Sequence, residues 1–138
     1  MKSVSRASNP STVWSVPAAF KPIYSHAHEV AAGARLLFIS GQLGVSPDDG
    51  LSTEFRAQAV QAMANIENIL AASGMAVSNV IKLTYFVTKP ENLPVLGELR
   101  TERWSSSEPP AVTVLVVAGL ASPKYLIEIE AVAAAEAR

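Results

Sequence analysis

The chain has no cysteine and few charged side chains. Of its 138 residues, 11 are Lys or Arg, 12 are Asp or Glu and two are His, which gives a net charge of -1. The absence of cysteine excludes thiolate catalysis, disulfide scaffolds and zinc-thiolate sites. The absence of a basic cluster argues against nucleic-acid binding, which depends on several Lys and Arg side chains that displace counterions from the phosphate backbone.

Long apolar runs are also missing. A segment that crosses a bilayer needs about 20 apolar residues, and the longest runs here, such as 114–117, are far shorter, so no membrane association is expected. Proline and polar residues at positions 10–12 interrupt the apolar core that a secretory signal requires. We therefore expect a cytoplasmic protein in which residues 1–20 form a partly disordered arm and residues 21–138 form one domain.

Hydrophobic periodicity predicts the secondary structure. Two short apolar segments on either side of Gly33 favour a β-hairpin. Apolar residues recur every three or four positions after Thr53 and again after Asn92, which predicts two amphipathic helices. The hairpin strands are expected at 30–32 and 36–40, and three further strands at 80–87, 111–120 and 125–133. This order predicts an α+β domain in which both helices cover one face of a mixed sheet.

The expected strand at 111–120 is apolar on both faces, although two helices can cover only one face of a sheet. Burying each Val or Leu side chain contributes about 1.5 to 3 kcal/mol. The chain is 49% hydrophobic and 17% charged. We therefore expect the uncovered face to pack against other copies of the chain.

Four short segments carry a family resemblance. They are PIYSHA at 22–27, FISGQ at 38–42, the helix from Gln58 to Gly74, and a pair made of PA at 110–111 and IEIEA at 127–131. In this order, and over residues 22 to 132, the chain resembles the reactive intermediate deaminase family (Rid, formerly YjgF). The resemblance implies a chorismate-mutase-like α+β fold with a six-stranded mixed sheet and two helices on one face. It also implies a homotrimer whose clefts are shared by neighbouring subunits.

The same resemblance implies an activity and a set of site residues. Family members hydrolyse small enamines and imines to ketones and ammonia, with no cofactor and no metal ion. Glu128 matches the catalytic carboxylate of the last strand, and Ser40 and Gly41 match the backbone that holds the reacting nitrogen and water. Tyr24 matches an aromatic wall of the cleft. The arginine that binds the substrate carboxylate in well-studied members is replaced here by Val112.

This replacement keeps two functions open. An arginine makes two parallel charged hydrogen bonds to a carboxylate, whereas a valine makes none. Arg100, Arg103 and Lys82 are candidates to supply the positive charge from another direction, and Thr113 is a candidate for the cleft wall. The alternative to a hydrolase is a noncatalytic trimer that binds a small metabolite.

Other interpretations of the acidic and histidine residues are weaker. Glu128 as a general acid or base competes with an ion pair to Lys or Arg at the subunit junction, and the resemblance favours catalysis. Glu128 and Glu130 project in parallel about 7 Å apart, unlike the carboxylates that face each other across a glycosidase substrate. We expect a structural pairing for Glu130. His26 and His28 share one strand face, but two ligands without a third are a weak indication of a metal site.

Overall fold

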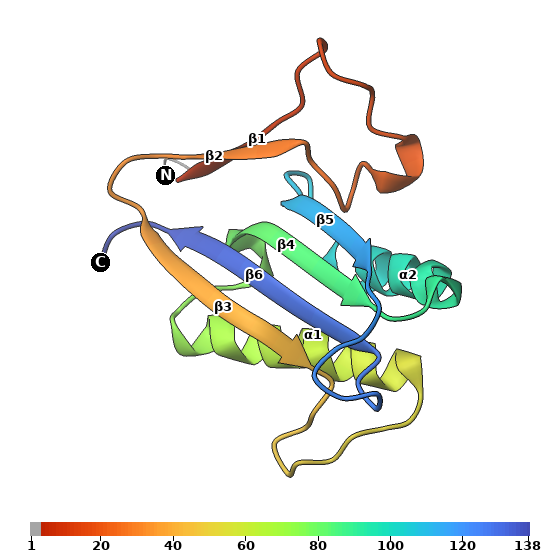
Figure 1. The fold of residues 1–138 in the computed structure, drawn as a ribbon. Coiled ribbons are helices and arrows are strands. Elements are labelled where there is room, and N and C mark those ends of the chain that lie inside the picture. The colour runs from red at the N-terminus through yellow and green to blue at the C-terminus, as the bar shows by residue number, and fades with distance from the viewer. Residues whose placement is uncertain (1–3) are drawn as a thin grey trace.

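The main sheet of the molecule has four strands, with both long helices on one of its faces (Figure 1). The structure is a computed structural model that describes residues 4–138. The strands are β3 (Arg35–Leu43), β4 (Val80–Val87), β5 (Ala111–Val116) and β6 (Ile127–Ala135), in the spatial order β3-β6-β4-β5. β4 and β5 are parallel, and β6 is antiparallel to both β3 and β4. The predicted α+β class and the mixed sheet are confirmed.

The helices are α1 (Phe55–Ala72) and α2 (Leu93–Trp104). Three short 3-10 turns accompany them, η1 (Ala18–Phe20), η2 (Val77–Asn79) and η3 (Pro90–Asn92). The chain leaves α1 through Gly74, whose φ of 68° lies in the left-handed region that glycine adopts at least cost. Neither helix in residues 4–138 is long and apolar enough to cross a membrane.

The predicted hairpin around Gly33 is wrong. The strand before it, β2 (Ala27–Val30), pairs with β1 (Ser5–Ser8) of the N-terminal arm, and the strand after it, β3, pairs with β6. Gly33, with φ of 83°, turns the chain out of the small sheet and into the main one. The six strands are therefore divided between two sheets, and a bridge between Ser25 and Ala111 attaches the smaller sheet to the edge strand β5.

The N-terminal arm also differs from expectation, because its described residues are packed against the domain. Apart from the strand pairing, the Ala7 N–H donates to the Glu108 carboxylate and the Asn9 carboxamide accepts from the His26 N–H. Between β1 and β2 the arm forms a wide loop (Figure 1), and Phe20 in this loop lies beside the edge strand β5. Met1 to Ser3, which belong to the predicted arm, lie outside the described residues.

The core lies between the main sheet and the two helices. Its apolar side chains come from the inner faces of α1, α2, β4 and β6, as the periodicities predict. Fully or almost fully buried members are Ala59, Met63, Ile66 and Leu70 of α1, Leu83, Tyr85 and Val87 of β4, Leu96 and Leu99 of α2, and Ile127 and Ile129 of β6. The strands at 111–120 and 125–133 are displaced from their predicted bounds: β5 ends at Val116, before a loop with Gly119 and Pro123, and β6 begins at Ile127.

The opposite face of the sheet is uncovered and carries several exposed apolar side chains. Phe38 is 73% exposed, Leu36 is 51% exposed and Leu115 is 43% exposed. Leu36 and Phe38 alternate along β3 with side chains that point toward α1, so the exposure follows from the two-residue repeat of a strand. This is the face that the sequence assigns to contacts with other copies of the chain.

Candidate functional site

A β-bulge interrupts the pairing of β3 with β6 at Ser40 and Gly41. Ile39 pairs with Ala131 and Gln42 pairs with Ile129, so two residues of β3 lie opposite one residue of β6. A bulge of this kind bends the strand and turns its backbone and side chains away from the regular ladder. The Ser40 carbonyl, for example, accepts a hydrogen bond from the Gln42 side chain at 3.2 Å.

The Glu128 carboxylate lies directly against the backbone of Gly41. A Cβ atom at position 41 would overlap Oε1 of Glu128 and would lie 2.6 Å from its Cδ. Only glycine therefore leaves room for the carboxylate at this place. The structure brings together Gly41 and Glu128, with Ser40 beside them in the bulge, from segments that are almost ninety residues apart in the sequence.

Glu128 is half-buried and makes no ion pair with any residue that the structure describes. The ion pairs within residues 4–138 are Arg6–Glu29, Arg56–Glu98 and Arg103–Glu67. Within the described residues of one chain, Glu128 therefore takes no part in a surface salt bridge. A half-buried carboxylate beside open backbone is suited to hold a water molecule or a polar ligand atom and to exchange a proton with it.

A second group of candidate residues lines a hollow at the edge strand β5. Tyr24, Arg100 and Val112 are in its wall, together with Trp14, Pro17, Phe20 and Val114, and its volume is about 250 Å³. Val112 and Val114 pair with Leu83 and Tyr85 on β4, whose side chains are buried under the sheet. The hollow therefore lies on the helix side of the sheet and is mostly apolar.

Arg100 is the charged residue of this hollow, and it is only 7% exposed. Its guanidinium donates to the Ile23 carbonyl at 3.0 Å, and its Cζ atom lies 5.1 Å from the centre of the Tyr85 ring. Burial lowers the pKa of Arg100, because the surroundings disfavour the charged form. Burial likewise raises the pKa of Tyr85, an effect that the charge of Arg100 partly opposes.

The aromatic wall of the hollow is held by a histidine. Trp14 stacks on Tyr24 with ring centres 5.8 Å apart, and the His26 ring packs edge-on against Trp14 at 4.3 Å. Nε2 of His26 lies 2.7 Å from the Trp14 carbonyl, which can only accept a hydrogen bond. In the neutral ring Nδ1 is then the acceptor, and the Tyr24 hydroxyl lies 3.0 Å from it. These contacts make the arm a wall of the hollow.

Three candidates from the sequence, Arg103, Thr113 and Lys82, lie elsewhere. Arg103 pairs with Glu67 at 2.9 Å on the far side of α2 and lines a different hollow. Thr113 projects from the outer face of the sheet, where its hydroxyl accepts a hydrogen bond from the Lys82 ammonium at 2.8 Å. Lys82 also lies on this outer face, so it is not in the hollow with Val112.

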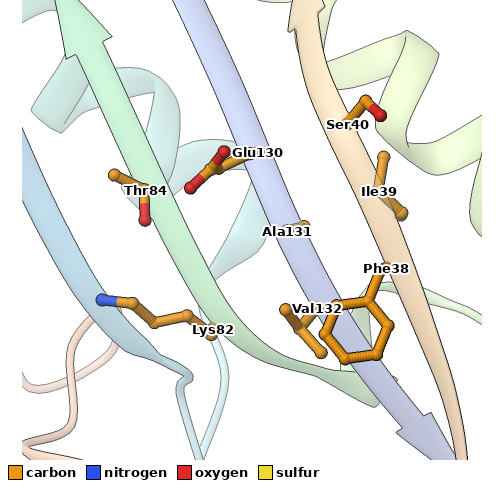
Figure 2. A pocket seen from close by; sticks show the side chains of 8 residues that line it. All are labelled: Phe38, Ile39, Ser40, Lys82, Thr84, Glu130, Ala131 and Val132. Atoms are coloured by element: carbon orange, nitrogen blue, oxygen red, sulfur yellow. The ribbon is translucent and has the colours of Figure 1, made fainter.

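The outer face carries a shallow depression of its own. Figure 2 shows Lys82, Thr84 and Glu130 projecting beside Phe38 and Ser40. Glu130 is exposed and pairs across the ladder with Thr84, without an ion pair to any residue that the structure describes. The structural pairing expected for Glu130 is therefore not found within one chain.

The two histidines are engaged with backbone atoms. His26 contacts the Trp14 carbonyl, and Nε2 of His28 lies 3.0 Å from the Pro109 carbonyl. In the part of the chain that the structure describes, no group of three or more His, Asp or Glu residues is arranged to hold a metal ion.

The two groups of candidate residues lie on opposite faces of the sheet within one chain. Glu128 alternates with the buried Ile127 and Ile129 and so faces outward, whereas Val112 faces α2. Tyr24 and Arg100 accompany Val112, and Ser40 and Gly41 accompany Glu128. A single chain thus presents two half-sites.

Sequence reasoning missed the two further aromatic residues that line the hollow, Trp14 and Phe20. Both belong to the arm, which was expected to be partly disordered. A signal was available, because three aromatic residues between positions 14 and 24 are unusual in a segment without a packed structure.

Known proteins match this chain over most of its length. The fold and the two half-sites define a small α+β protein with a carboxylate held against a glycine backbone at a β-bulge. A family model described as "Endoribonuclease L-PSP" matches residues 16–135. The chain belongs to this family, which is also known as the YjgF or Rid family.

Individual relatives agree with the assignment. The chain is 34% identical over 116 residues to a RutC family protein of Pyrococcus horikoshii, covering 82% of this chain and 89% of that protein. It is 30% identical over 132 residues to the 2-iminobutanoate/2-iminopropanoate deaminase of Dermatophagoides farinae, covering 93% and 99%. The crystal structure of a Rid family protein of unknown function, YyfB of Yersinia pestis, has a TM-score of 0.82 at 31% identity and covers 95% of this chain and 98% of that one.

Proposed function

We propose that the protein is a hydrolase that releases ammonia from a small reactive enamine or imine, at clefts between the subunits of a homotrimer. The observation that carries the proposal is the Glu128 carboxylate held against the backbone of Gly41. Relatives named as 2-iminobutanoate/2-iminopropanoate deaminases, from Dermatophagoides farinae and Homo sapiens, support the reaction class.

The proposed reaction needs one group that moves protons. Water adds to the carbon of the C=N bond, and Glu128 accepts the proton that the water loses while the π electrons pass to nitrogen. Glu128 then returns the proton to nitrogen. The hydroxyl of this intermediate passes its own proton to nitrogen by way of Glu128, the C–N bond breaks with its electrons leaving on ammonia, and the hydroxyl oxygen becomes the ketone oxygen. An enamine enters the same sequence after its carbon gains a proton and its nitrogen loses one, which gives the imine. The backbone at Ser40 and Gly41 anchors the reacting nitrogen and water.

The trimer completes the site by joining two half-sites. The exposed apolar side chains of Leu36, Phe38 and Leu115 supply part of the surface that subunits would bury. In that assembly the hollow with Tyr24 and Val112 on one subunit faces the Glu128 group of its neighbour. This arrangement accounts for the separation of the two half-sites within a single chain.

A noncatalytic metabolite-binding trimer is the second candidate, and Val112 is the observation that favours it. In the hollow, Val112 offers no hydrogen bond to a substrate carboxylate. A ribonuclease activity has no comparable support, because the chain carries 11 basic and 12 acidic residues without a basic cluster.

Replacement of Glu128 by Gln separates the two candidates. Imines are generated in situ by an amino acid oxidase, and ammonia and ketone release are followed with and without the protein. We expect wild-type turnover and a loss of about 100-fold or more in Glu128→Gln, the range for a general acid or base. Glu130→Gln is the matched control, two residues along the same strand face, and should keep its activity. Equal rates in wild type and Glu128→Gln would exclude the proposed role.

A further inference from the structure

Arg100 is a buried cation that has no ion-pair partner among residues 4–138. It is 7% exposed, and no carboxylate among residues 4–138 forms an ion pair with it. A buried charge is costly unless it is paired or fully hydrogen-bonded. A guanidinium has five N–H donors, and the Ile23 carbonyl accepts one hydrogen bond from Arg100. The neighbouring Tyr85 supplies a side-chain hydrogen bond and the face of its ring, but no negative charge.

The surroundings of Arg100 indicate the kind of anion that fits. Arg100 lines the hollow of about 250 Å³, and the other lining residues are apolar or aromatic. Val112 and Val114 form its floor on β5, and Trp14 and Tyr24 stack to form a flat wall. A cation at one side of a hollow with aromatic walls is complementary to a carboxylate attached to a flat apolar body.

We infer that Arg100 binds the carboxylate of the substrate and that the hollow accepts a carboxylic acid whose remaining body is aromatic or bulky and apolar. This inference rests on the proposed function, since it names the substrate class of that hydrolase. Val112 then has a positive role, because a small apolar residue leaves the floor open for the apolar body. The positive charge that binds the substrate carboxylate is then carried by Arg100 on α2, and not by a residue of the strand β5.

The test measures binding apart from turnover. Isothermal titration uses three probes on the full chain: 3-phenylpropanoate, its neutral amide 3-phenylpropanamide, and propanoate, which lacks the ring. We expect 3-phenylpropanoate to bind at least tenfold more tightly than either of the others. Arg100→Met should remove the preference for the acid over the amide and weaken acid binding at least tenfold, and Arg100→Lys should retain part of the preference.

Two further variants keep the test decisive. Arg56→Met removes the same charge from the exposed Arg56–Glu98 pair, away from the hollow, and should bind as wild type does. Val114→Phe fills the hollow without touching the charge, and should abolish binding even if Arg100→Met fails to fold by circular dichroism.

The outcomes separate this inference from the proposed function. Equal affinity for acid and amide in the wild type, or unchanged acid affinity in a folded Arg100→Met variant, would overturn the inference. Acid binding that depends on Arg100, in a protein without any turnover, would sustain the ligand class and refute the hydrolase. Turnover that depends on Glu128 but not on Arg100 would do the reverse.

Discussion

Gly41 is the residue whose lack of a side chain lets the Glu128 carboxylate lie against the backbone. The position lies in a β-bulge, and the space that a Cβ atom would occupy is taken by Glu128. Glycine is needed here for close approach, because its lack of a side chain lets a carboxylate lie on the chain itself.

Replacing Gly41 by Ala should therefore impair turnover more than stability. The new methyl group would displace the Glu128 carboxylate by an ångström or more, and a displacement of that size costs about 100-fold in rate. The measurement is the ammonia-release assay, with urea denaturation to follow the free energy of unfolding. Turnover within threefold of wild type would contradict the proposed contact between position 41 and the reacting groups.

Gly97→Ala is the matched control for that substitution. Gly97 lies inside α2, and nothing is within 4 Å of the place where its Cβ would be. Alanine is preferred to glycine in a helix by about 1 kcal/mol, so this variant should be slightly more stable and equally active.

At the scale of single residues, the sequence was informative where strands are regular. The two-residue repeat of β6 predicts that Glu128 and Glu130 face away from the core, as the structure confirms. The contact of Glu128 with Gly41 depends on the register of two distant strands and on a bulge, which no local pattern encodes. The placement of Arg100 beside Val112 was equally inaccessible, because the roll of a helix against a sheet is decided by packing.

Among the secondary-structure elements, α1 has the most direct effect on the position of Glu128. Its buried Gln58 donates to the carbonyls of Ser52 and Lys124 at 2.8 and 2.9 Å, and its Oε1 accepts from the Leu126 N–H at 2.9 Å. Leu126 immediately precedes β6, so the amide fixes the start of the strand that carries Glu128. The start of α1 is thus tied to the loops that precede α1 and β6.

Gln58→Leu should destabilise the fold. The leucine is similar in size, but it leaves one N–H and two carbonyl groups without their partners, and each unsatisfied buried group costs about 1 to 3 kcal/mol. We expect the free energy of unfolding to fall by about 3 kcal/mol in urea denaturation. Asn68→Leu, at an exposed position of the same helix, should change it by less than about 0.5 kcal/mol. A loss as small as that in Gln58→Leu would show that the three hydrogen bonds do not hold the start of β6.

At this scale the helices and β4 were predictable and the N-terminal strands were not. Periodicity identifies α1, α2 and β4 because each element has one clearly apolar face. The hairpin prediction failed because β1, a short polar strand of Ser, Arg and Ala, gives no pattern of its own, although it pairs with β2. Pairing partners are decided by the whole chain, and local turn residues such as Gly33 do not specify them.

For the whole molecule, the uncovered sheet face is the feature with the largest expected consequence. Its exposed Phe38, Leu36 and Leu115 form part of a surface that a stable single chain rarely leaves in water. The proposed trimer removes this surface from solvent and closes the clefts in which the proposed chemistry occurs.

Phe38→Glu should dissociate the trimer. A carboxylate at this position of β3 would be removed from water in the assembly, whereas the side chain is 73% exposed in the single chain and tolerates a charge there. Light scattering should give three times the mass of one chain for wild type and the mass of one chain for the variant, with unchanged circular dichroism. Val13→Glu, on the arm, is the control and should leave the mass unchanged. A wild-type monomer would refute the assembly, and a trimeric Phe38→Glu variant would place its contacts on another face.

The packing of the N-terminal arm has a practical consequence for anyone preparing this protein. A truncated protein that begins at residue 21, where the sequence predicts the start of the domain, would lack β1 and the hollow residues Trp14 and Phe20. The shortened chain would keep the residues of its core, yet it would lack two of the three aromatic residues that line the hollow. A negative result in an activity or binding assay on such a preparation would then reflect the missing residues and not the chemistry of the full chain.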